Sequence, residues 1–332
     1  MLWKKLKDKK VECQLCSHRC KISEEEKGIC GVRENRGGTL YSLAYGKVIA
    51  ANIDPIEKKP LFHFLPGTIS FSIATAGCNF HCSFCQNWDI SQLSKEWKGE
   101  FPGKDLSCEE IVEEAVKNKC KSIAYTYTEP TIFFEYAYDT AKLAQKKGLK
   151  NVFVTNGFQT PETIEKMVGV IDAANIDLKS FSGEFYRKVC GGRLQPVLEA
   201  IKMMWEKKIW VEVTTLVIPG QNDSDEELGK IAQFLASVSC DIPWHISRFY
   251  PQYKMRDNIP TPLETLHRAY EIGKKAGLNY IYVGNVWGDK YESTYCPVCG
   301  EVLIKRIGYL TEVFLKDKNR CPACNFKLPG VF

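Results

Sequence analysis

Three cysteines with regular spacing could bind a reactive metal cluster. Cys78, Cys82 and Cys85 form the motif CxxxCxxC, directly after a strand-like run of residues. A cluster of four irons normally takes four cysteine thiolates, so three ligands would leave one iron open to a small molecule. The spacing therefore predicts a catalytic iron–sulfur cluster. A zinc knuckle and three unrelated buried thiols are the alternative interpretations.

Four cysteines near the carboxyl terminus have the spacing of a closed metal site. Cys296 and Cys299 form one CxxC pair, Cys321 and Cys324 form a second, and the segment 300–320 separates them. Four thiolates would complete a tetrahedral, structural site of the zinc-ribbon or rubredoxin-like kind. Zinc is the preferred metal and a single iron the alternative, because spacing does not distinguish the two. The segment has little core of its own, so the metal would supply its folding energy.

A third group of cysteines, near the amino terminus, is less regular in spacing: Cys13, Cys16, Cys20 and Cys30. We expect a closed zinc site here. The main alternative is an auxiliary iron–sulfur cluster that relays electrons or touches the substrate. Cys190 stands alone in a loop with two glycines, where a small apolar filler is a simpler interpretation than a reactive thiol.

The composition is that of an enzyme-sized globular protein. The chain has 332 residues, of which 44% are hydrophobic and 12% aromatic, enough to bury a full core. Residues 1–12 lack the apolar stretch of a signal peptide, and no apolar run approaches the roughly 18 residues of a membrane span. We therefore expect a cytoplasmic protein whose 15 cysteines serve metal binding and not disulfides. The net charge of +5 is modest and the charges are interspersed, which argues against a nucleic-acid partner.

Short apolar segments alternate with amphipathic ones from about residue 68 to residue 283. The apolar segments are expected to be buried strands of a parallel sheet: 69–75, 122–127, 151–155, 173–178, 210–218 and 244–247. The amphipathic segments are expected to be helices: 108–119, 132–147, 161–168, 194–207, 225–237 and 263–276. Six strand–helix units predict an α/β fold, either a barrel or a doubly wound sheet.

Polar side chains lie on or directly after five of these strands. In chain order they are Tyr127, Thr128, Glu129, Thr155, Asn156, Asp177, Lys179, Thr214 and His245. Active sites of barrels collect at the carboxyl ends of the strands, which makes these residues candidate cofactor ligands. Ordinary structural roles compete with this interpretation. A proline after Glu129 would start a helix there, and a lone strand histidine is more often a satisfied core residue.

Several longer stretches resemble one enzyme family. They are CQLCSHRC from Cys13, IDPIEKKPLFH from Ile53, GCNFHCSFCQNW from Gly77, TYTEPT from Thr126 and IPGQND from Ile218. With the two carboxyl-terminal CxxC pairs, they make the whole chain similar to the AmmeMemoRadiSam-system radical S-adenosylmethionine (SAM) enzymes, relatives of pyruvate formate-lyase activating enzyme. The resemblance implies an open, partial (β/α)6 barrel with its cluster on the loop after the first strand. We accordingly divide the chain into a Cys-rich metal-binding segment 1–60, a core barrel 61–290 and a zinc-ribbon-like module 291–332.

The resemblance also implies roles for the candidate residues. Cys78, Cys82 and Cys85 would bind a [4Fe-4S] cluster, and SAM would chelate its open iron. The family places a Gly-Gly-Glu-Pro segment against the SAM amino group, and here Tyr127 and Thr128 replace the glycines before Glu129. Residues matching Thr155, Asn156, Asp177 and Lys179 surround the SAM ribose and carboxylate in related activating enzymes. Thr214 stands where such enzymes often carry arginine, and His245 matches a histidine near the adenosine.

The implied chemistry is the one-electron cleavage of SAM to methionine and a 5′-deoxyadenosyl radical, which abstracts hydrogen from a substrate. The substrate would be a protein or a small molecule, with a Memo-like or AMMECR-type protein as partner. A flavodoxin or ferredoxin would donate the electron. The competing hypothesis is a non-catalytic iron–sulfur or zinc protein for electron transfer or scaffolding. That hypothesis explains the grouped cysteines but not the polar residues at matching strand ends.

Overall fold

An eight-stranded sheet forms the centre of the protein, in a computed structural model that describes residues 1–97 and 99–332. Its order is β15-β14-β13-β12-β11-β10-β8-β7, and every neighbouring pair is parallel except β7 and β8. The strands are β7 (Ala50–Pro55), β8 (Ile69–Ala74), β10 (Ser122–Tyr125), β11 (Lys150–Thr155), β12 (Ala173–Asp177), β13 (Trp210–Val217), β14 (Trp244–Arg248) and β15 (Ile281–Gly284).

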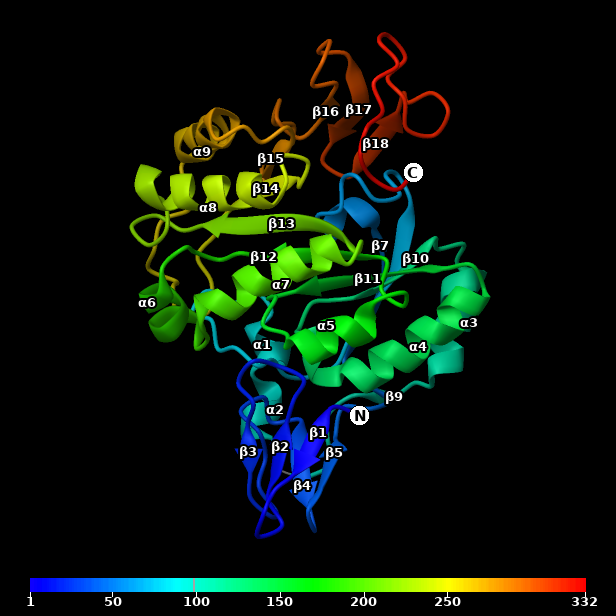
Figure 1. The fold of residues 1–332 in the computed structure, drawn as a ribbon, viewed down its shortest axis with the longest axis vertical. Coiled ribbons are helices and arrows are strands. Elements are labelled where there is room, and N and C mark those ends of the chain that lie inside the picture. Colours follow the sequence, from blue (N-terminus) through cyan, green and yellow to red (C-terminus); the bar gives the residue numbers. More distant parts are fainter. Residues whose placement is uncertain (98) are drawn as a thin grey trace.

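Helices follow the strands along the chain and cover the outside of the curved sheet (Figure 1). The long ones are α3 (Cys108–Lys117), α4 (Phe134–Lys146), α5 (Pro161–Met167), α7 (Leu194–Glu206), α8 (Asp225–Val238) and α9 (Leu263–Lys275). Helix α3 begins where the sequence dictates, because Ser107 and Glu110 form a reciprocal capping box. Short helical elements lie between these strands and helices along the chain: η1 (Ile56–Lys58), α1 (Trp88–Ser91), α2 (Leu93–Glu96), η2 (Pro130–Phe133), α6 (Gly183–Phe185) and η3 (Tyr186–Cys190).

This arrangement confirms the predicted α/β fold with six strand–helix units. The predicted strands correspond to β8 and β10–β14, and the predicted helices to α3, α4, α5, α7, α8 and α9. Two strands of this sheet were not predicted. Strand β15 adds a parallel edge, and β7 pairs antiparallel with β8 from Ala50↔Ala74 to Pro55↔Ile69, so the sheet extends into the range 1–60.

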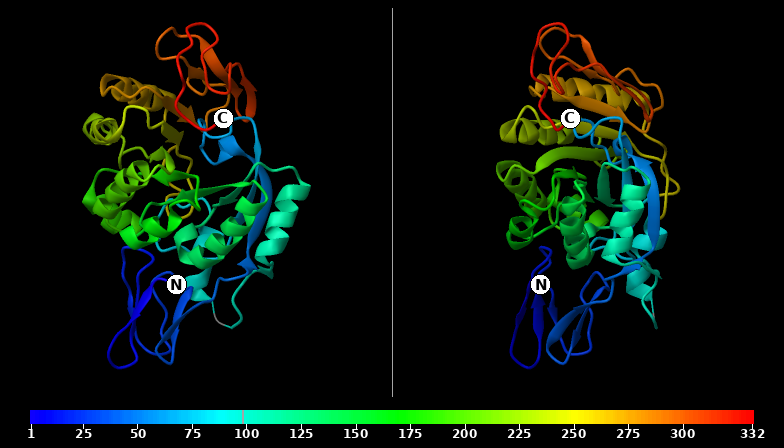
Figure 2. Two further views of the ribbon diagram at one scale, coloured as in Figure 1. Left: turned by 45° about the vertical axis from the view of Figure 1, so that its right-hand side comes forward. Right: turned by 90° about the vertical axis from the view of Figure 1, so that its right-hand side faces the viewer.

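Small modules lie at the two ends of the long axis (Figures 1 and 2). The amino-terminal module contains β1 (Trp3–Lys5), β2 (Val11–Cys13), β3 (Lys21–Ile22), β4 (Arg33–Arg36) and β5 (Thr39–Ser42). Strand β6 (Lys47–Val48) pairs with β9 (Lys104–Asp105) beside it. The carboxyl-terminal module contains β16 (Thr294–Tyr295), β17 (Val302–Ile307) and β18 (Leu310–Val313).

Hydrogen bonds fix the amino-terminal module to the barrel near the end of β11. The hydroxyl groups of Thr160 and Thr163 donate to the carbonyl oxygens of Gln14 (2.6 Å) and Leu15 (2.8 Å). The backbone N–H of Ser17 donates to the carbonyl oxygen of Phe158 at 2.9 Å. Since all of these groups are at least partly shielded from water, the module is a docked part of the barrel wall.

The segment 56–65 follows β7 and packs against the sheet, and we call its contact with the β15 edge the seam, where Phe62 packs in one cluster with Tyr280 and Tyr282. The carboxylate of Glu212 accepts hydrogen bonds from the backbone N–H groups of Phe62 (2.9 Å) and His63 (2.8 Å). From the carboxyl-terminal module, the Arg306 guanidinium donates to the Phe62 carbonyl oxygen at 2.7 Å and stacks on its ring. The seam is therefore closed by side chains of both the barrel and the carboxyl-terminal module.

The buried histidine His63 should make the stability of the seam depend on pH. Burial lowers its pKa to about 4 from 6.5, and its ring nitrogens bind the Pro329 carbonyl oxygen (2.8 Å) and the Tyr282 hydroxyl (2.6 Å). Between these pKa values the unfolded chain binds the proton that the folded protein excludes, so stability falls as pH drops from 6.5 to 4. We expect His63→Asn to remove up to about 3 kcal/mol of this pH dependence, measured by denaturant unfolding across the window.

The control for this prediction is His267→Asn, because His267 is half-buried and lies outside the seam. An identical slope of stability against pH in the wild type and in His63→Asn would contradict the assignment.

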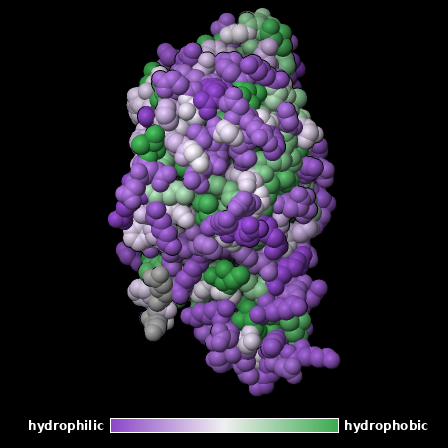
Figure 3. Space-filling view, turned by 90° about the vertical axis from the view of Figure 1, so that its left-hand side faces the viewer, coloured by the Kyte–Doolittle hydropathy of each residue, from purple (hydrophilic) through white to green (hydrophobic). Residues whose placement is uncertain are grey.

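Within the described residues, no helix combines the length and apolar character needed to cross a bilayer. In the view of Figure 3 hydrophilic residues cover most of the molecule, and hydrophobic residues form smaller groups between them.

Candidate functional site

A cavity of about 490 Å³ opens at the carboxyl ends of the central strands. The loop between β8 and α1 forms one wall and carries Cys78, Cys82 and Cys85, all three of which line the cavity. Short-range contacts orient two of these thiols. The Phe80 N–H points at the Cys78 sulfur (3.4 Å), and the Cys85 sulfur contacts the Ser91 hydroxyl (3.3 Å). The predicted cysteine motif therefore faces a site large enough for a cofactor.

The three thiols are not gathered as closely as the ligands of a single metal ion would be. Among the residues that the structure describes, these sulfurs do not all lie within 4.8 Å of one another. A tetrahedral zinc ion with bonds of about 2.3 Å would hold its sulfur ligands about 3.8 Å apart. A polynuclear cluster binds each thiolate to a different iron and so needs a wider triangle. Three thiols without a fourth in the motif fit a [4Fe-4S] cluster with one open iron.

Eight of the nine predicted strand-end residues line this cavity, opposite and beside the cysteine loop. They are Tyr127, Thr128, Glu129, Thr155, Asn156, Asp177, Lys179 and Thr214. Strands that lie far apart in the chain thus meet at one edge, as expected of parallel strands joined by crossover helices. Phe80 and Phe84 of the cysteine loop add apolar surface.

Glu129 organises the floor of the cavity. Its buried carboxylate accepts hydrogen bonds from the Thr131 N–H (3.0 Å), the Thr155 hydroxyl (2.7 Å) and the Asn156 N–H (2.8 Å). Burial holds the pKa of Glu129 above its usual value, and these donors offset that rise only in part. The Asn156 side chain then donates to the Asn79 side-chain oxygen at 2.7 Å. Glu129 therefore connects the tips of β10 and β11 to the cysteine loop.

Replacing Glu129 with glutamine is expected to disorganise this floor. The amide would present N–H groups to donors that now face a carboxylate, at a cost of about 2 kcal/mol in stability. A loss of similar size in the free energy of binding corresponds to about 30-fold weaker SAM binding. Equilibrium dialysis of anaerobic protein with labelled SAM measures this. Glu184→Gln, at an exposed surface pair with Lys188, is the matched control, and equal affinities in both variants would contradict the prediction.

Tyr127 is held in an unusual conformation at the cavity wall. Its φ angle of 60° is uncommon for a large side chain, and its carbonyl oxygen accepts from the Asn87 side chain at 2.8 Å. Its hydroxyl donates to Asp54, whose carboxylate also binds the ammonium groups of Lys58 and Lys59, each at 2.7 Å. Burial lowers the pKa of Lys59 to about 8.

Sequence reasoning missed this network of Asp54, Lys58, Lys59 and Tyr127 as a part of the site. Lys58 and Lys59 line the cavity together with Tyr127. The available signal was the stretch IDPIEKKP, in which two adjacent lysines lie four and five residues after an aspartate.

Asp177 and Lys179 form an ion pair at the end of β12, with 2.8 Å between the ammonium nitrogen and the carboxylate oxygen. Burial alone would lower the pKa of Lys179, but Asp177 and nearby thiols raise it well above its usual value. The ammonium group therefore stays charged inside the cavity. Thr214 lines the wall through its side chain, although its hydroxyl already donates to the Asn175 side chain at 2.9 Å.

His245 is the exception, since it is absent from the described residues that line the cavity. It is 3% exposed, and its Nε2 lies 2.7 Å from a carboxylate oxygen of Glu212. Its ring stacks on Tyr282 and meets Phe62 edge-on. The expected contact with a nucleoside stays a prediction, and in this structure Glu212 on the neighbouring strand holds the imidazole within the seam.

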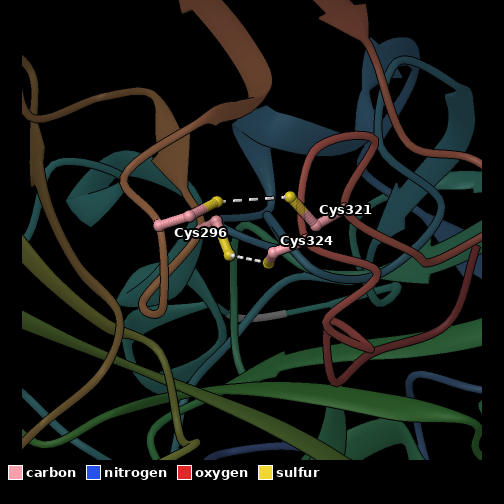
Figure 4. Close-up of side chains that lie close together, drawn as sticks. Cys296, Cys321 and Cys324 are labelled. Carbon is pink, nitrogen blue, oxygen red and sulfur yellow. Dashed lines mark hydrogen bonds between the residues drawn. The ribbon is translucent and has the colours of Figure 1, made fainter.

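The carboxyl-terminal cysteines form the compact metal site that the spacing predicts (Figure 4). The sulfurs of Cys296 and Cys324 are 3.5 Å apart, those of Cys299 and Cys321 are 3.6 Å apart, and all four lie within 4.8 Å of one another. This agrees with the sulfur separation of about 3.8 Å around a tetrahedral zinc ion. The same module extends Tyr309 to the rim of the central cavity.

Comparison with known proteins gives consistent matches. The model of the Radical SAM superfamily matches residues 72–235. An uncharacterized protein of Methanocaldococcus jannaschii, MJ0808, is 45% identical over 331 residues, which cover 99% of this chain and 98% of the relative. Pyruvate formate-lyase 1-activating enzyme of Escherichia coli is 25% identical over 231 residues, which cover 64% of this chain and 91% of that enzyme.

The fold is also found among solved structures. A radical SAM methyltransferase from Sphaerobacter thermophilus aligns with a TM-score of 0.53 and 15% identity, covering 72% of this chain and 71% of the other. At this identity the likeness concerns the fold alone.

Proposed function

Because the chain belongs to the radical SAM superfamily, we propose that it cleaves SAM reductively and uses the product to take a hydrogen atom from a substrate. The observation that carries this proposal is one cavity lined by three thiols and by eight polar strand-end residues. When bound, the cluster and SAM supply a 5′-deoxyadenosyl radical at this place. The protein provides the cavity that orients them and excludes water.

Different residues of the cavity would bind the cluster and SAM. Cys78, Cys82 and Cys85 would hold three irons of a [4Fe-4S] cluster. The charged ammonium group of Lys179 suits the SAM carboxylate, a contact that is stronger in a shielded site. Asn156 would be placed for the same nucleoside by its backbone contact with Glu129.

The substrate is proposed to be presented by a partner protein. Relatives that activate another enzyme support a protein substrate, and a Memo-like or AMMECR-type protein is the partner that the sequence resemblance suggests. The walls around the cavity opening include Lys58, Asn285 and Tyr309, from three different parts of the chain. A docking protein would meet all three. A flavodoxin or ferredoxin is proposed as the electron donor, and the cytoplasm as the place of action.

Anaerobic reconstitution tests the proposal directly. With iron, sulfide, SAM and a strong reductant, the protein should release 5′-deoxyadenosine, whereas a non-catalytic iron–sulfur or zinc scaffold should not. Deuterium-labelled partner proteins and small molecules then identify the hydrogen donor, because the label appears in 5′-deoxyadenosine. Absence of the nucleoside from fully loaded, reduced protein would refute the function.

A further inference from the structure

The four cysteines near the amino terminus lie side by side in their module. The Cys13 N–H donates to the Cys20 carbonyl oxygen at 3.0 Å, and Cys13 and Cys30 are only 6% and 8% exposed. A Cβ atom placed on Gly28 would lie 3.7 Å from the Cys20 Cβ, which brings the segment before Cys30 against Cys20. Cys16 completes the group, since its carbonyl oxygen accepts from the backbone N–H of Arg19, the residue before Cys20, at 3.0 Å.

These thiols are spread more widely than the ligands of one metal ion. No three of them lie mutually within 4.8 Å in the described part of the chain, whereas the carboxyl-terminal four do. The same structure thus contains a compact four-thiol group and a wide one. Zinc accounts for the compact group, but a single ion cannot reach four sulfurs at the wider spacing with bonds of about 2.3 Å. A polynuclear cluster can, because its ligands bind different irons.

The amino-terminal group also abuts the cysteine loop of the cavity. The His18 ring nitrogen Nε2 lies 2.9 Å from the carbonyl oxygen of Asn79, the residue after Cys78. The Ser94 hydroxyl donates to the Cys30 carbonyl oxygen at 2.7 Å. A side chain at Gly77 would lie 2.5 Å from that same hydroxyl oxygen, so only glycine permits the close approach.

We propose that Cys13, Cys16, Cys20 and Cys30 bind a second, polynuclear iron–sulfur cluster that passes single electrons to the cluster of the cavity. A donor of the flavodoxin or ferredoxin class reduces the second cluster by one electron. That cluster returns to its oxidised state as the electron moves to the cavity, and no bond or proton changes. The relay rests on the proposed function, whereas the metal site does not.

Metal content tests the site without any enzymatic reaction. In the full-length triple variant Cys78→Ala/Cys82→Ala/Cys85→Ala, reconstituted anaerobically, about half of the wild-type iron and sulfide should remain, with an EPR signal after reduction. Adding Cys16→Ala should remove that iron, while adding Cys240→Ala, an exposed and isolated thiol, should not. Zinc in place of iron at this group, or loss of all iron in the triple variant, would overturn the proposal.

The wild-type protein provides a measurement that does not depend on a folded variant. Its reduced form should show two EPR signals, of which SAM perturbs one and leaves the other unchanged. A single signal that responds fully to SAM would also overturn the second cluster. If SAM cleavage failed while the triple variant kept its iron, the proposed function would fall and the second cluster would stand.

The relay is tested by the choice of reductant. In Cys16→Ala, release of 5′-deoxyadenosine driven by reduced flavodoxin should fall about tenfold or more. Release driven by dithionite, a small reductant that needs no docking site, should fall several-fold less than release driven by flavodoxin. An equal loss with both reductants would contradict the relay.

Discussion

Replacing Cys82 with alanine is expected to reduce the release of 5′-deoxyadenosine from SAM to background, a loss of more than about 1,000-fold. Two remaining thiols cannot hold a four-iron cluster whose motif already supplies one ligand fewer than usual. The side chain itself is 7% exposed and small, so the fold should tolerate its truncation. Anaerobic assay by mass spectrometry, with iron and sulfide determined on the same sample, measures the effect.

The matched control is Cys120→Ala. Cys120 is 4% exposed, a burial similar to that of Cys82, but it lies just before β10 and away from the cavity lining. Both variants lose one buried sulfur, and only Cys82→Ala should lose iron and SAM cleavage. If Cys82→Ala still cleaves SAM, the assignment of Cys82 as a cluster ligand is wrong.

Replacing Cys321 with serine is expected to release the metal of the carboxyl-terminal module and to unfold residues 291–332. Structural zinc contributes about 10–16 kcal/mol to the folding of small metal modules at neutral pH. The apolar core here is small, consisting mainly of Tyr280, Tyr282, Leu303, Ile304 and Leu328. It cannot offset a loss of that size.

Limited proteolysis and zinc analysis of Cys321→Ser measure this outcome, with Cys240→Ser as the exposed control. The module should become sensitive to protease while the barrel resists it. If the module resists the protease after complete loss of metal, its contacts with the seam are enough to keep it folded, and the prediction is wrong.

The strands and the cavity lining could be predicted from the sequence because two regular patterns coincide. Short apolar runs mark buried parallel strands, and each run ends in polar residues such as Glu129, Asn156 and Lys179. Parallel strands bring those ends to one edge whatever their distance in the chain. The cysteine spacing equally distinguishes the motif of the cavity from the paired carboxyl-terminal knuckles.

Features that depend on a specific partner could not be predicted in this way. Strand β7 has the sequence AANIDP, which is neither apolar nor alternating, and it is a strand because β8 offers it an edge. Nothing in the sequence around His245 indicates that Glu212 on the adjacent strand will bind its ring. The conformation of Tyr127 follows from Asp54 and Lys59, more than 60 residues earlier in the chain.

Tyr309 has a broader consequence. It contributes to the wall of the cavity that carries the three-cysteine motif, and it belongs to the module that contains the compact four-cysteine group. With zinc bound to these four cysteines and the proposed cluster in the cavity, a cell short of zinc would produce protein whose cluster is intact but whose substrate entrance is misshapen. The activity of one enzyme would then depend on the supply of two metals. Iron would determine whether it reacts, and zinc would determine which substrate can enter.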